Sequence, residues 1–313
     1  MGLERTEARP IRGEKDFWRL RELLIETHAI TPPGFNWEIR RWDGAYFYGE
    51  SPGWRSPSWG RSTLWQTSEG QAVAAIHPEG EGEAFLELHP DYRHLEEEMV
   101  VRAERDLAVA SGEGGARQLE IYVYEYDAPR RRLLEERGYE KRTAGGVFRQ
   151  LRLGRQAIPK SELAEGYRLR TTRTTEDDDG PRIAALLNAA FGRTFHQAGE
   201  WQTFSRMAPS YRNDLDLVAE APDGALAAYV SLTFDEANRY ALFEPVCTHP
   251  DHRRRDLARA LMLEGLQRVR DLGATLVSVD TGDQVAANRL YEAMGFTEAY
   301  KGYSWRKVLT ATG

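Results

Sequence analysis

The sequence predicts a mixed α/β protein built from two tandem domains of one fold, each a mostly antiparallel mixed sheet flanked by helices. A length of 313 residues suits two domains of ordinary size. Short segments of the first half recur in the second half in the same order and at near-constant offsets. Strand and helix patterns alternate along the second half, which favours helices packed on the faces of one sheet.

Three pairs of segments carry the internal repeat. Residues 63–76 resemble residues 216–229, and both read as two short strands joined by a turn, around Gly70 in the first copy. HPDYR in the first half matches HPDHR in the second, and ERGYE matches AMGFT. The stretch 154–166 is polar, carries a proline and has no strand pattern, so it is typical of a linker. We therefore expect one domain over residues 1–155 and another over residues 156–313.

The second half gives the clearer element pattern. Residues 167–173 alternate like a first strand, and Pro181 lies where the first turn of a helix tolerates proline. A helix over 256–272 has one apolar stripe, and a helix over 285–294 ends at Gly295, a residue type common just past a helix end. Strands are predicted over 215–221, 225–233, 240–248 and 275–280, followed by a closing hairpin of 296–300 and 303–308.

Composition excludes several classes of protein. The net charge of −7 and the pI near 5.7 argue against a general nucleic-acid binder. Apolar runs are too short for a membrane helix, and no secretory signal pattern opens the sequence. The single cysteine, Cys247, excludes an internal disulfide and a four-cysteine zinc site. We expect a cytoplasmic protein with no membrane or nucleic-acid partner and no metal.

The most informative stretch is FEPVCTHPDHRRRDLARALM, residues 243–262. A strand ends, a short loop carries three arginines, and a helix begins. Helix N-termini attract anions because their first N–H groups have no partners within the helix and the dipole end is positive. The pattern predicts a cradle for a phosphate or pyrophosphate, unless the arginines form only a solvated cluster beside a capped helix.

This stretch resembles the acyl-CoA loop of the GNAT acetyltransferase superfamily, whose signature is Gln/Arg-x-x-Gly-x-Gly/Ala between a strand and a long helix. The second family signature, an Asn-x-x-Ala-x-x-Leu-Tyr-Glu-x-x-Gly-Phe helix, is matched by QVAANRLYEAMGF at 284–296, except that Gln284 stands where asparagine is common. The resemblance covers the whole second half, and the repeat extends it to a tandem pair of GNAT-like domains. It implies acetyl-CoA as cosubstrate, held by Val246, Cys247, Thr248, Arg253, Arg254, Arg255, Asp256, Leu257, Ala258, Gln284 and Ala287.

Two departures from the family pattern bear on this resemblance. Asp256 stands at the first signature glycine, where it brings a side chain and a negative charge close to the expected pyrophosphate. We expect weaker binding of CoA, offset by the arginines or by an Asp256 side chain turned outward to cap the helix. In the first half the loop is shorter, and Glu96, Glu97 and Glu98 stand where the anion would bind. That half resembles a GNAT fold that has lost its CoA site.

The resemblance also implies catalytic residues. The family transfers an acyl group directly from CoA to an amine, a reaction helped by a base for the amine and an acid for the leaving thiolate. Glu244 is the candidate base, although it could be an exposed carboxylate on the polar face of its strand. Tyr291 is the candidate acid, although it could be a core aromatic. Pro245 in the same strand indicates a bulge or splay that would make room for the pantetheine arm.

The expected function is therefore that of an acetyl-CoA-dependent N-acetyltransferase, acting on a primary amine of a small molecule at one site in the C-terminal domain. The alternative is a non-catalytic acyl-CoA sensor or an interaction scaffold built from two degenerate GNAT domains. The aromatic residues in 192–211 and 33–65 have three alternative roles: they pack in a core, line an acceptor cleft or cover a dimer interface. The last of these would make the protein a homodimer.

Overall fold

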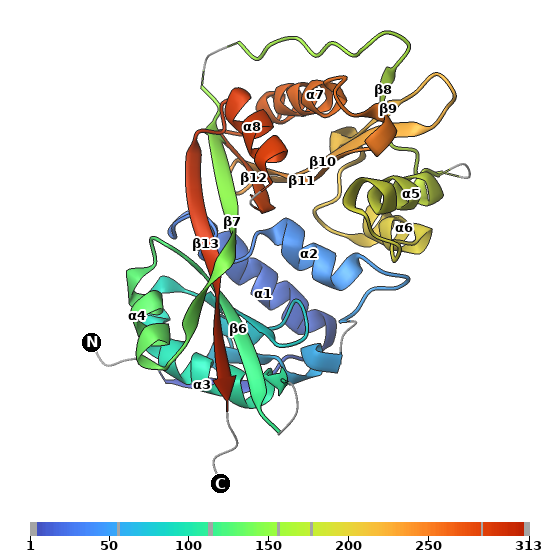
Figure 1. Cartoon of the computed structure of the whole chain (residues 1–313). Helices are drawn as coiled ribbons and strands as arrows, with labels where there is room; N and C mark the ends of the chain where they lie inside the picture. Colours follow the sequence, from blue (N-terminus) through green and yellow to red (C-terminus); the bar gives the residue numbers. More distant parts are fainter. Residues whose placement is uncertain are drawn as a thin grey trace. The chain divides into compact units, whose positions relative to one another are not determined.

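The chain folds into two compact units (Figure 1). A computed structural model describes residues 5–54, 57–111, 115–154, 157–175, 178–282 and 284–309. Unit 1 comprises Met1–Ala45, Gly53–Phe148 and Tyr300–Gly313. Unit 2 comprises Tyr46–Pro52 and Arg149–Ala299.

Unit 1 contains a mixed sheet in the order β1-β2-β3-β4-β6-β13, with β5 paired to β6. Neighbouring strands are antiparallel except for β4 and β6, which run parallel. Helices α1 and α3 pack against β3 and β4, and every residue of β3 is buried, so both of its faces are covered. The elements are β1 (Thr6–Pro10), α1 (Gly13–His28), α2 (Ile39–Phe47), η1 (Pro57–Arg61), β2 (Thr63–Thr67), β3 (Ala72–His77), β4 (Glu83–Leu88), η2 (Pro90–Leu95), α3 (Glu96–Asp106), β5 (Val109–Ala110), β6 (Arg117–Tyr124), α4 (Ala128–Glu136) and β7 (Glu140–Arg152), which continues into unit 2.

Unit 2 has the order β7-β12-β11-β10-β9-β8, with β11 and β12 parallel and β8 to β11 antiparallel. The predicted strand 240–248 is confirmed residue for residue as β11, and the other predicted helices and strands before residue 295 differ only at their ends. The elements are β8 (Arg168–Thr171), α5 (Gly180–Phe191), α6 (Ala198–Met207), η3 (Asn213–Leu215), β9 (Asp216–Glu220), β10 (Leu226–Asp235), β11 (Tyr240–Thr248), η4 (Pro250–His252), α7 (Leu257–Asp271), β12 (Leu276–Gly282), α8 (Val285–Ala293) and β13 (Glu298–Leu309), which returns to unit 1.

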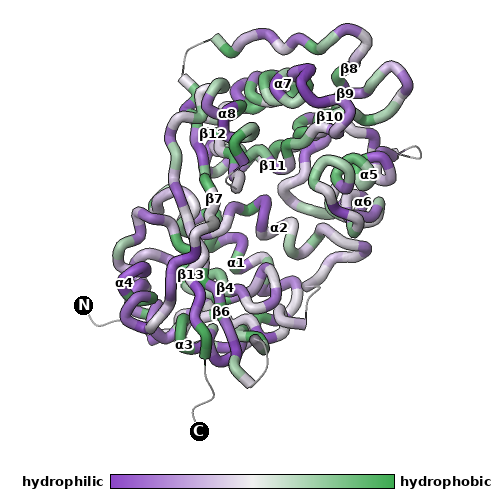
Figure 2. The backbone as a smooth tube through the Cα atoms, viewed as in Figure 1, coloured by the Kyte–Doolittle hydropathy of each residue, from purple (hydrophilic) through white to green (hydrophobic). Residues whose placement is uncertain are grey.

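The sheet of unit 2 is covered on both faces. Leu217 and Val230 pack in one apolar cluster with α7, whereas Val218 and Tyr229 pack in another with α5 and α6. The side chains of adjacent residues in a strand therefore point to opposite faces of the sheet, because side-chain direction alternates with every residue. Figure 2 shows α7 as a mainly hydrophobic helix with hydrophilic residues at its end.

The predicted closing hairpin at the C-terminus is wrong, because residues 298–309 form one continuous strand. Gly302 suggested a turn, but it lies within β13, where a Cβ would fall 2.4 Å from the Tyr122 hydroxyl oxygen. The glycine therefore permits close packing. Residues from Gly302 to Leu309 pair with β6 of unit 1, and Trp305 is buried in the core of that unit. The sequence analysis expected the second domain to run without interruption over residues 156–313, whereas Tyr300–Gly313 belong to unit 1.

Two helices in aromatic-rich stretches were not anticipated. α2 lies within the stretch 33–65, and α6 lies within 192–211. The Gln197 N–H donates to the Glu200 carboxylate at 3.4 Å at the start of α6, but glutamine is not a usual N-cap residue, so this helix start has no ordinary capping pattern. Most of the aromatic side chains in both stretches are buried, so core packing accounts for them. Of the predicted linker, Arg155 and Gln156 lie outside the described residues, and residues 157–164 form neither helix nor strand.

The position of Trp305 predicts which unit the C-terminal strand stabilises. Trp305→Ala should lower the free energy of unfolding of unit 1 by about 3–5 kcal/mol, the usual loss for a buried tryptophan. Val308→Ala, an exposed position on the same strand, should change it by less than about 0.5 kcal/mol. Denaturation followed by amide hydrogen exchange measures each unit separately. A loss confined to unit 2 would contradict the assignment of the strand.

Candidate functional site

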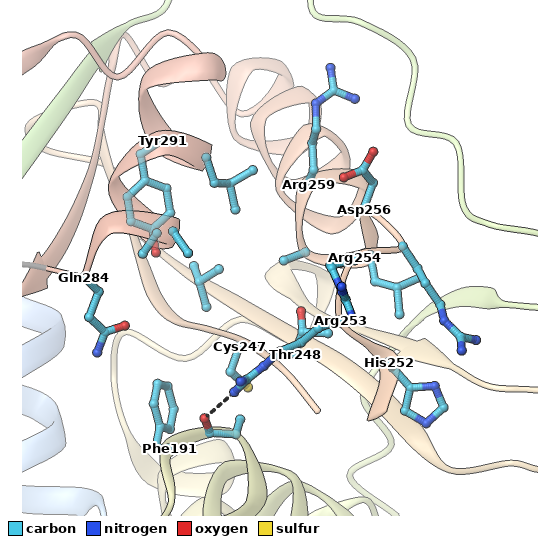
Figure 3. A pocket seen from close by; sticks show the side chains of 18 of the residues that line it. Phe191, Cys247, Thr248, His252, Arg253, Arg254, Asp256, Arg259, Gln284 and Tyr291 are labelled. Carbon is cyan, nitrogen blue, oxygen red and sulfur yellow. Dashed lines mark hydrogen bonds between the residues drawn. The ribbon is translucent and has the colours of Figure 1, made fainter. Parts of the chain in front are cut away.

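A cavity of about 710 Å³ opens in unit 2, a volume typical of small-molecule sites. It is bounded by the C-terminal end of α5, the end of β11, the loop and first turn of α7, and one face of α8. Figure 3 shows Tyr291 and Gln284 on one side of it and Asp256 and Arg259 on the other. The lining residues are Ala190, Phe191, Arg193, Val246, Cys247, Thr248, His252, Arg253, Arg254, Arg255, Asp256, Leu257, Ala258, Arg259, Gln284, Ala286, Ala287, Leu290 and Tyr291.

The cavity begins where two parallel strands separate. β11 and β12 pair from Tyr240 to Phe243, and within the described residues the pairing stops there. The register of β11 against β10 shifts between Phe243 and Val246, as the predicted bulge at Pro245 requires. His249 donates its N–H to the Ala227 carbonyl, so the N–H and C=O groups of Thr248 and Val246 point away from β10. These backbone groups face the separation.

The start of α7 supplies further donors. Its first intrahelical bond runs from the Ala260 N–H to the Asp256 carbonyl, which leaves the N–H groups of Leu257, Ala258 and Arg259 without helical acceptors. Asp256 has the left-handed conformation (φ 55°, ψ 20°) that a glycine adopts freely. The expected helix-capping bond from its side chain is absent among the described residues. Asp256 therefore has the backbone conformation expected of the glycine that stands at this position in the family signature.

The arginines of the loop have different partners. Arg253 donates to the Ala190 carbonyl at the end of α5 at 3.0 Å, and Arg255 donates to the Tyr167 hydroxyl. Arg254 has no hydrogen-bond or ion-pair partner in the described part of the chain, and the same holds for Arg259. Arg259 was missed by the sequence analysis, although it lies in the first turn of the predicted helix, which directly follows the three arginines of the loop. Two arginines remain available to an anion.

Tyr291 lies on α8 and is buried, with 5% of its surface exposed. Burial, with smaller contributions from Asp280 and Cys247, raises the pKa of Tyr291 to about 12. Its hydroxyl therefore stays protonated and can donate a proton. Burial likewise raises the pKa of Cys247 to about 12, so this thiol is neutral and does not act as a nucleophile.

The predicted site residues divide into two groups. Tyr291 and all eleven residues predicted to hold acetyl-CoA line the cavity. Glu244 does not line it and is half-buried at the bulge of β11. The sequence analysis missed Phe191 and Arg193 at the end of α5. The residues of that helix do not indicate that its C-terminal end lies beside the end of β11.

The described residues contain no group of three or more His, Cys, Asp or Glu residues arranged to hold a metal ion. None of the helices in the described ranges is both long enough and apolar enough to cross a membrane.

The chain is similar to known proteins, to some over part of its length and to others over nearly all of it. Residues 181–296 match the acetyltransferase (GNAT) family. Mycothiol acetyltransferase of Kineococcus radiotolerans is 29% identical over 240 residues, which cover 74% of this chain and 75% of that protein.

Solved structures match over almost the full length. A tandem GNAT protein from the clavulanic acid biosynthesis pathway superposes with a TM-score of 0.67 at 18% identity, covering 99% of this chain and 100% of its own. A GCN5-related N-acetyltransferase from Sphaerobacter thermophilus gives a TM-score of 0.65 at 19% identity, with 97% and 95% covered. Residues 181–296 therefore match the acetyltransferase (GNAT) family, and nearly the whole chain has the fold of a tandem GNAT protein.

Proposed function

We propose that the chain transfers an acetyl group from acetyl-CoA to a primary amine of a small molecule, at one active site in unit 2. The observation that carries this proposal is the presence of two sets of backbone donors on one cavity. One set lies on the open edge of β11 at Val246 and Thr248, and the other lies at the start of α7. An extended ligand that has amides in one part and phosphates in another fits both sets.

Two regions of the cavity suit two parts of acetyl-CoA, the pantetheine arm and the pyrophosphate. The amides of the pantetheine arm pair with the N–H and C=O groups of Val246 and Thr248. The pyrophosphate binds at the N–H groups of Leu257 and Ala258, where the positive end of the helix dipole favours an anion. Arg254 and Arg259 add two positive charges there, and Gln284, directly before α8, forms the facing wall with Ala287 of α8.

In the reaction, the amine nitrogen attacks the thioester carbonyl, a C–N bond forms and the C–S bond breaks. Tyr291 gives its phenolic proton to the departing thiolate. Glu244 takes the proton lost by the amine, through water because it lies outside the cavity lining. Solvent then returns a proton to Tyr291 and removes one from Glu244. The raised pKa of Tyr291 keeps the acid in its protonated form.

The acceptor binds beside the end of α5. Phe191 and Arg193 line the cavity there, and Phe195 in the following loop is 60% exposed. Trp201 and Phe204, two other aromatic residues of the stretch 192–211, lie on α6 and are buried, so they do not form an acceptor wall. The relative named mycothiol acetyltransferase supports the reaction class, and the acceptor of that enzyme belongs in the substrate panel.

A single active site follows from the contrast between the two units. The α3 helix of unit 1 begins directly after η2, and three glutamates occupy its first turn. The counterpart of Tyr291 in the repeat is Leu134, which has no acidic proton to donate. These differences support chemistry in unit 2 alone.

The central test is acetyl transfer measured across pH with a panel of small amines. Tyr291→Phe should lower kcat by about 100-fold, the usual range for a general acid. The loss should be equal from about pH 6 to about pH 10, because the Tyr291 pKa near 12 keeps the wild-type phenol protonated throughout. Glu244→Gln should lower the rate most at low pH, where less of the amine is neutral. Unchanged kinetics in both variants would refute the catalytic assignments.

Three of the arginines that line the cavity predict a second pattern. Arg254→Gln and Arg259→Gln should each raise the KM for acetyl-CoA by about 10-fold, the loss of one charge-assisted hydrogen bond. Arg255→Gln is the matched control, because Arg255 is already bonded to Tyr167. With acetyl-pantetheine, which has no pyrophosphate, all three variants should match the wild type. Equal effects of all three on acetyl-CoA would show that the loop acts only through its total charge.

Two substitutions of Asp256 separate the effect of its strained backbone conformation from the effect of its negative charge. Asp256→Gly relieves a left-handed residue and removes a charge, so it should raise the free energy of unfolding by about 1 kcal/mol and tighten acetyl-CoA binding several-fold. Asp256→Asn tolerates the same backbone and removes only the charge, so it should tighten binding with little change in stability. Thermal denaturation and calorimetry measure the two effects. Weaker binding in both variants would show that the carboxylate itself serves the site.

A further inference from the structure

Unit 1 repeats the strand separation of unit 2. The parallel strands β4 and β6 pair only at Glu83 and Ala84, and the described residues beyond these positions diverge. Leu88 directly precedes the His-Pro pair in unit 1, as Thr248 does in unit 2. His89 donates to the Val73 carbonyl just as His249 donates to that of Ala227, so the two strand ends have the same orientation. Leu88 therefore presents its N–H and C=O to the separation.

Asn36 occupies this open edge. Its Oδ1 accepts the Leu88 N–H at 2.8 Å, and its Nδ2 donates to the Leu88 carbonyl at 3.1 Å. The same Nδ2 also donates to Thr27 Oγ1 at 2.8 Å, and the side chain is buried. A carboxamide offers one acceptor and one donor side by side, as an amide of the pantetheine arm does. Next to it, the Trp37 N–H donates to Glu87 at 2.8 Å.

The segment is held on the β6 side as well. Gly34 has φ +75°, and a Cβ there would lie 2.4 Å from the ring of Tyr124 at the end of β6. Tyr126, just beyond that strand, donates its hydroxyl to the Pro33 carbonyl at 2.8 Å. The segment therefore contacts both separated strands and fills the space between them.

The place of the pyrophosphate is filled too. At the start of α3, the Glu96 carboxylate accepts from Arg93 at 3.0 Å and from Arg130 at 2.7 Å. Arg93 also pairs with Asp127 at 2.6 Å. Both guanidiniums lie over the ring of Phe35, at 5.1 and 4.9 Å from its centroid. Arg130 comes from α4, so this cluster links α3 to the helix that corresponds to α8.

We propose that the segment Thr31–Trp37 is a built-in occupant of the cleft of unit 1, taking the place that acyl-CoA takes in unit 2. Asn36 replaces a pantetheine amide, and Glu96 replaces a phosphate at the helix N-terminus. Unit 1 consequently binds no acyl-CoA, and each chain binds one molecule. This inference rests on the proposed function for the identity of the ligand in unit 2, whereas the filled cleft of unit 1 rests on its own contacts.

Amide hydrogen exchange at Leu88 and Thr248, resolved by NMR, tests the inference on the full chain. In the ligand-free protein the Leu88 amide should exchange at least about 10-fold more slowly than the Thr248 amide. Saturating acetyl-CoA should slow Thr248 and leave Leu88 unchanged. If acetyl-CoA slows Leu88, or if Leu88 exchanges as fast as Thr248 without ligand, the inference is overturned. If Leu88 is protected and Thr248 does not respond, the filled cleft stands and acetyl-CoA binding in unit 2 fails.

A pair of variants identifies the group that protects Leu88. Asn36→Leu removes the carboxamide at similar volume and should speed Leu88 exchange by about 10-fold or more. Thr31→Ala is the matched control, because the Thr31 hydroxyl bonds the Thr27 carbonyl at the other end of the same segment. It should leave Leu88 exchange unaltered. Unaltered exchange in Asn36→Leu would overturn the role of Asn36, and the wild-type comparison decides the matter if that variant does not fold.

Discussion

The separation of two parallel strands governs both units of this protein. Where β11 leaves β12, and where β4 leaves β6, a row of backbone N–H and C=O groups loses its partners. Such groups are costly to bury without hydrogen bonds, so something must satisfy them. In unit 1 the Asn36 carboxamide does so at Leu88. In unit 2 the same groups at Thr248 line a cavity, which suits a ligand with amides of its own.

The same contrast recurs at the neighbouring helix N-termini. α3 begins with Glu96, whose carboxylate lies between two arginines and provides the negative charge that a helix start favours. α7 begins after Asp256, whose carboxylate does not cap the helix, while Arg254 and Arg259 line the cavity. A chain of net charge −7 can therefore hold an anion, because its positive charge is concentrated where the backbone donors converge.

The sequence is most informative where the determining contacts are local. The bulge at Pro245, the helix after the arginine loop and the glycine end of α8 each depend on neighbours in the chain, and each could be predicted. The closing strand could not, because Gly302 is required by Tyr122, a residue of β6 far along the sequence. The partners of Arg253 and Arg255 come from α5 and from Tyr167, so the loop sequence alone could not separate them from Arg254. The role of Asn36 could not be predicted either, because its partner Leu88 is distant in sequence.

The two copies have also exchanged segments, which bears on why the copy with a filled cleft remains folded. Unit 1 includes the C-terminal strand with Trp305 in its core, and unit 2 includes Tyr46–Pro52. Tyr48 of that segment packs against Phe204 of α6, with ring centroids 5.8 Å apart. Each unit is therefore completed by the other half of the chain. If unit 1 needed a ligand to satisfy Leu88, the core that contains both Leu88 and Trp305 would depend on that ligand. A cleft filled by Asn36 and Glu96 removes this dependence, because unit 1 is then complete without a ligand.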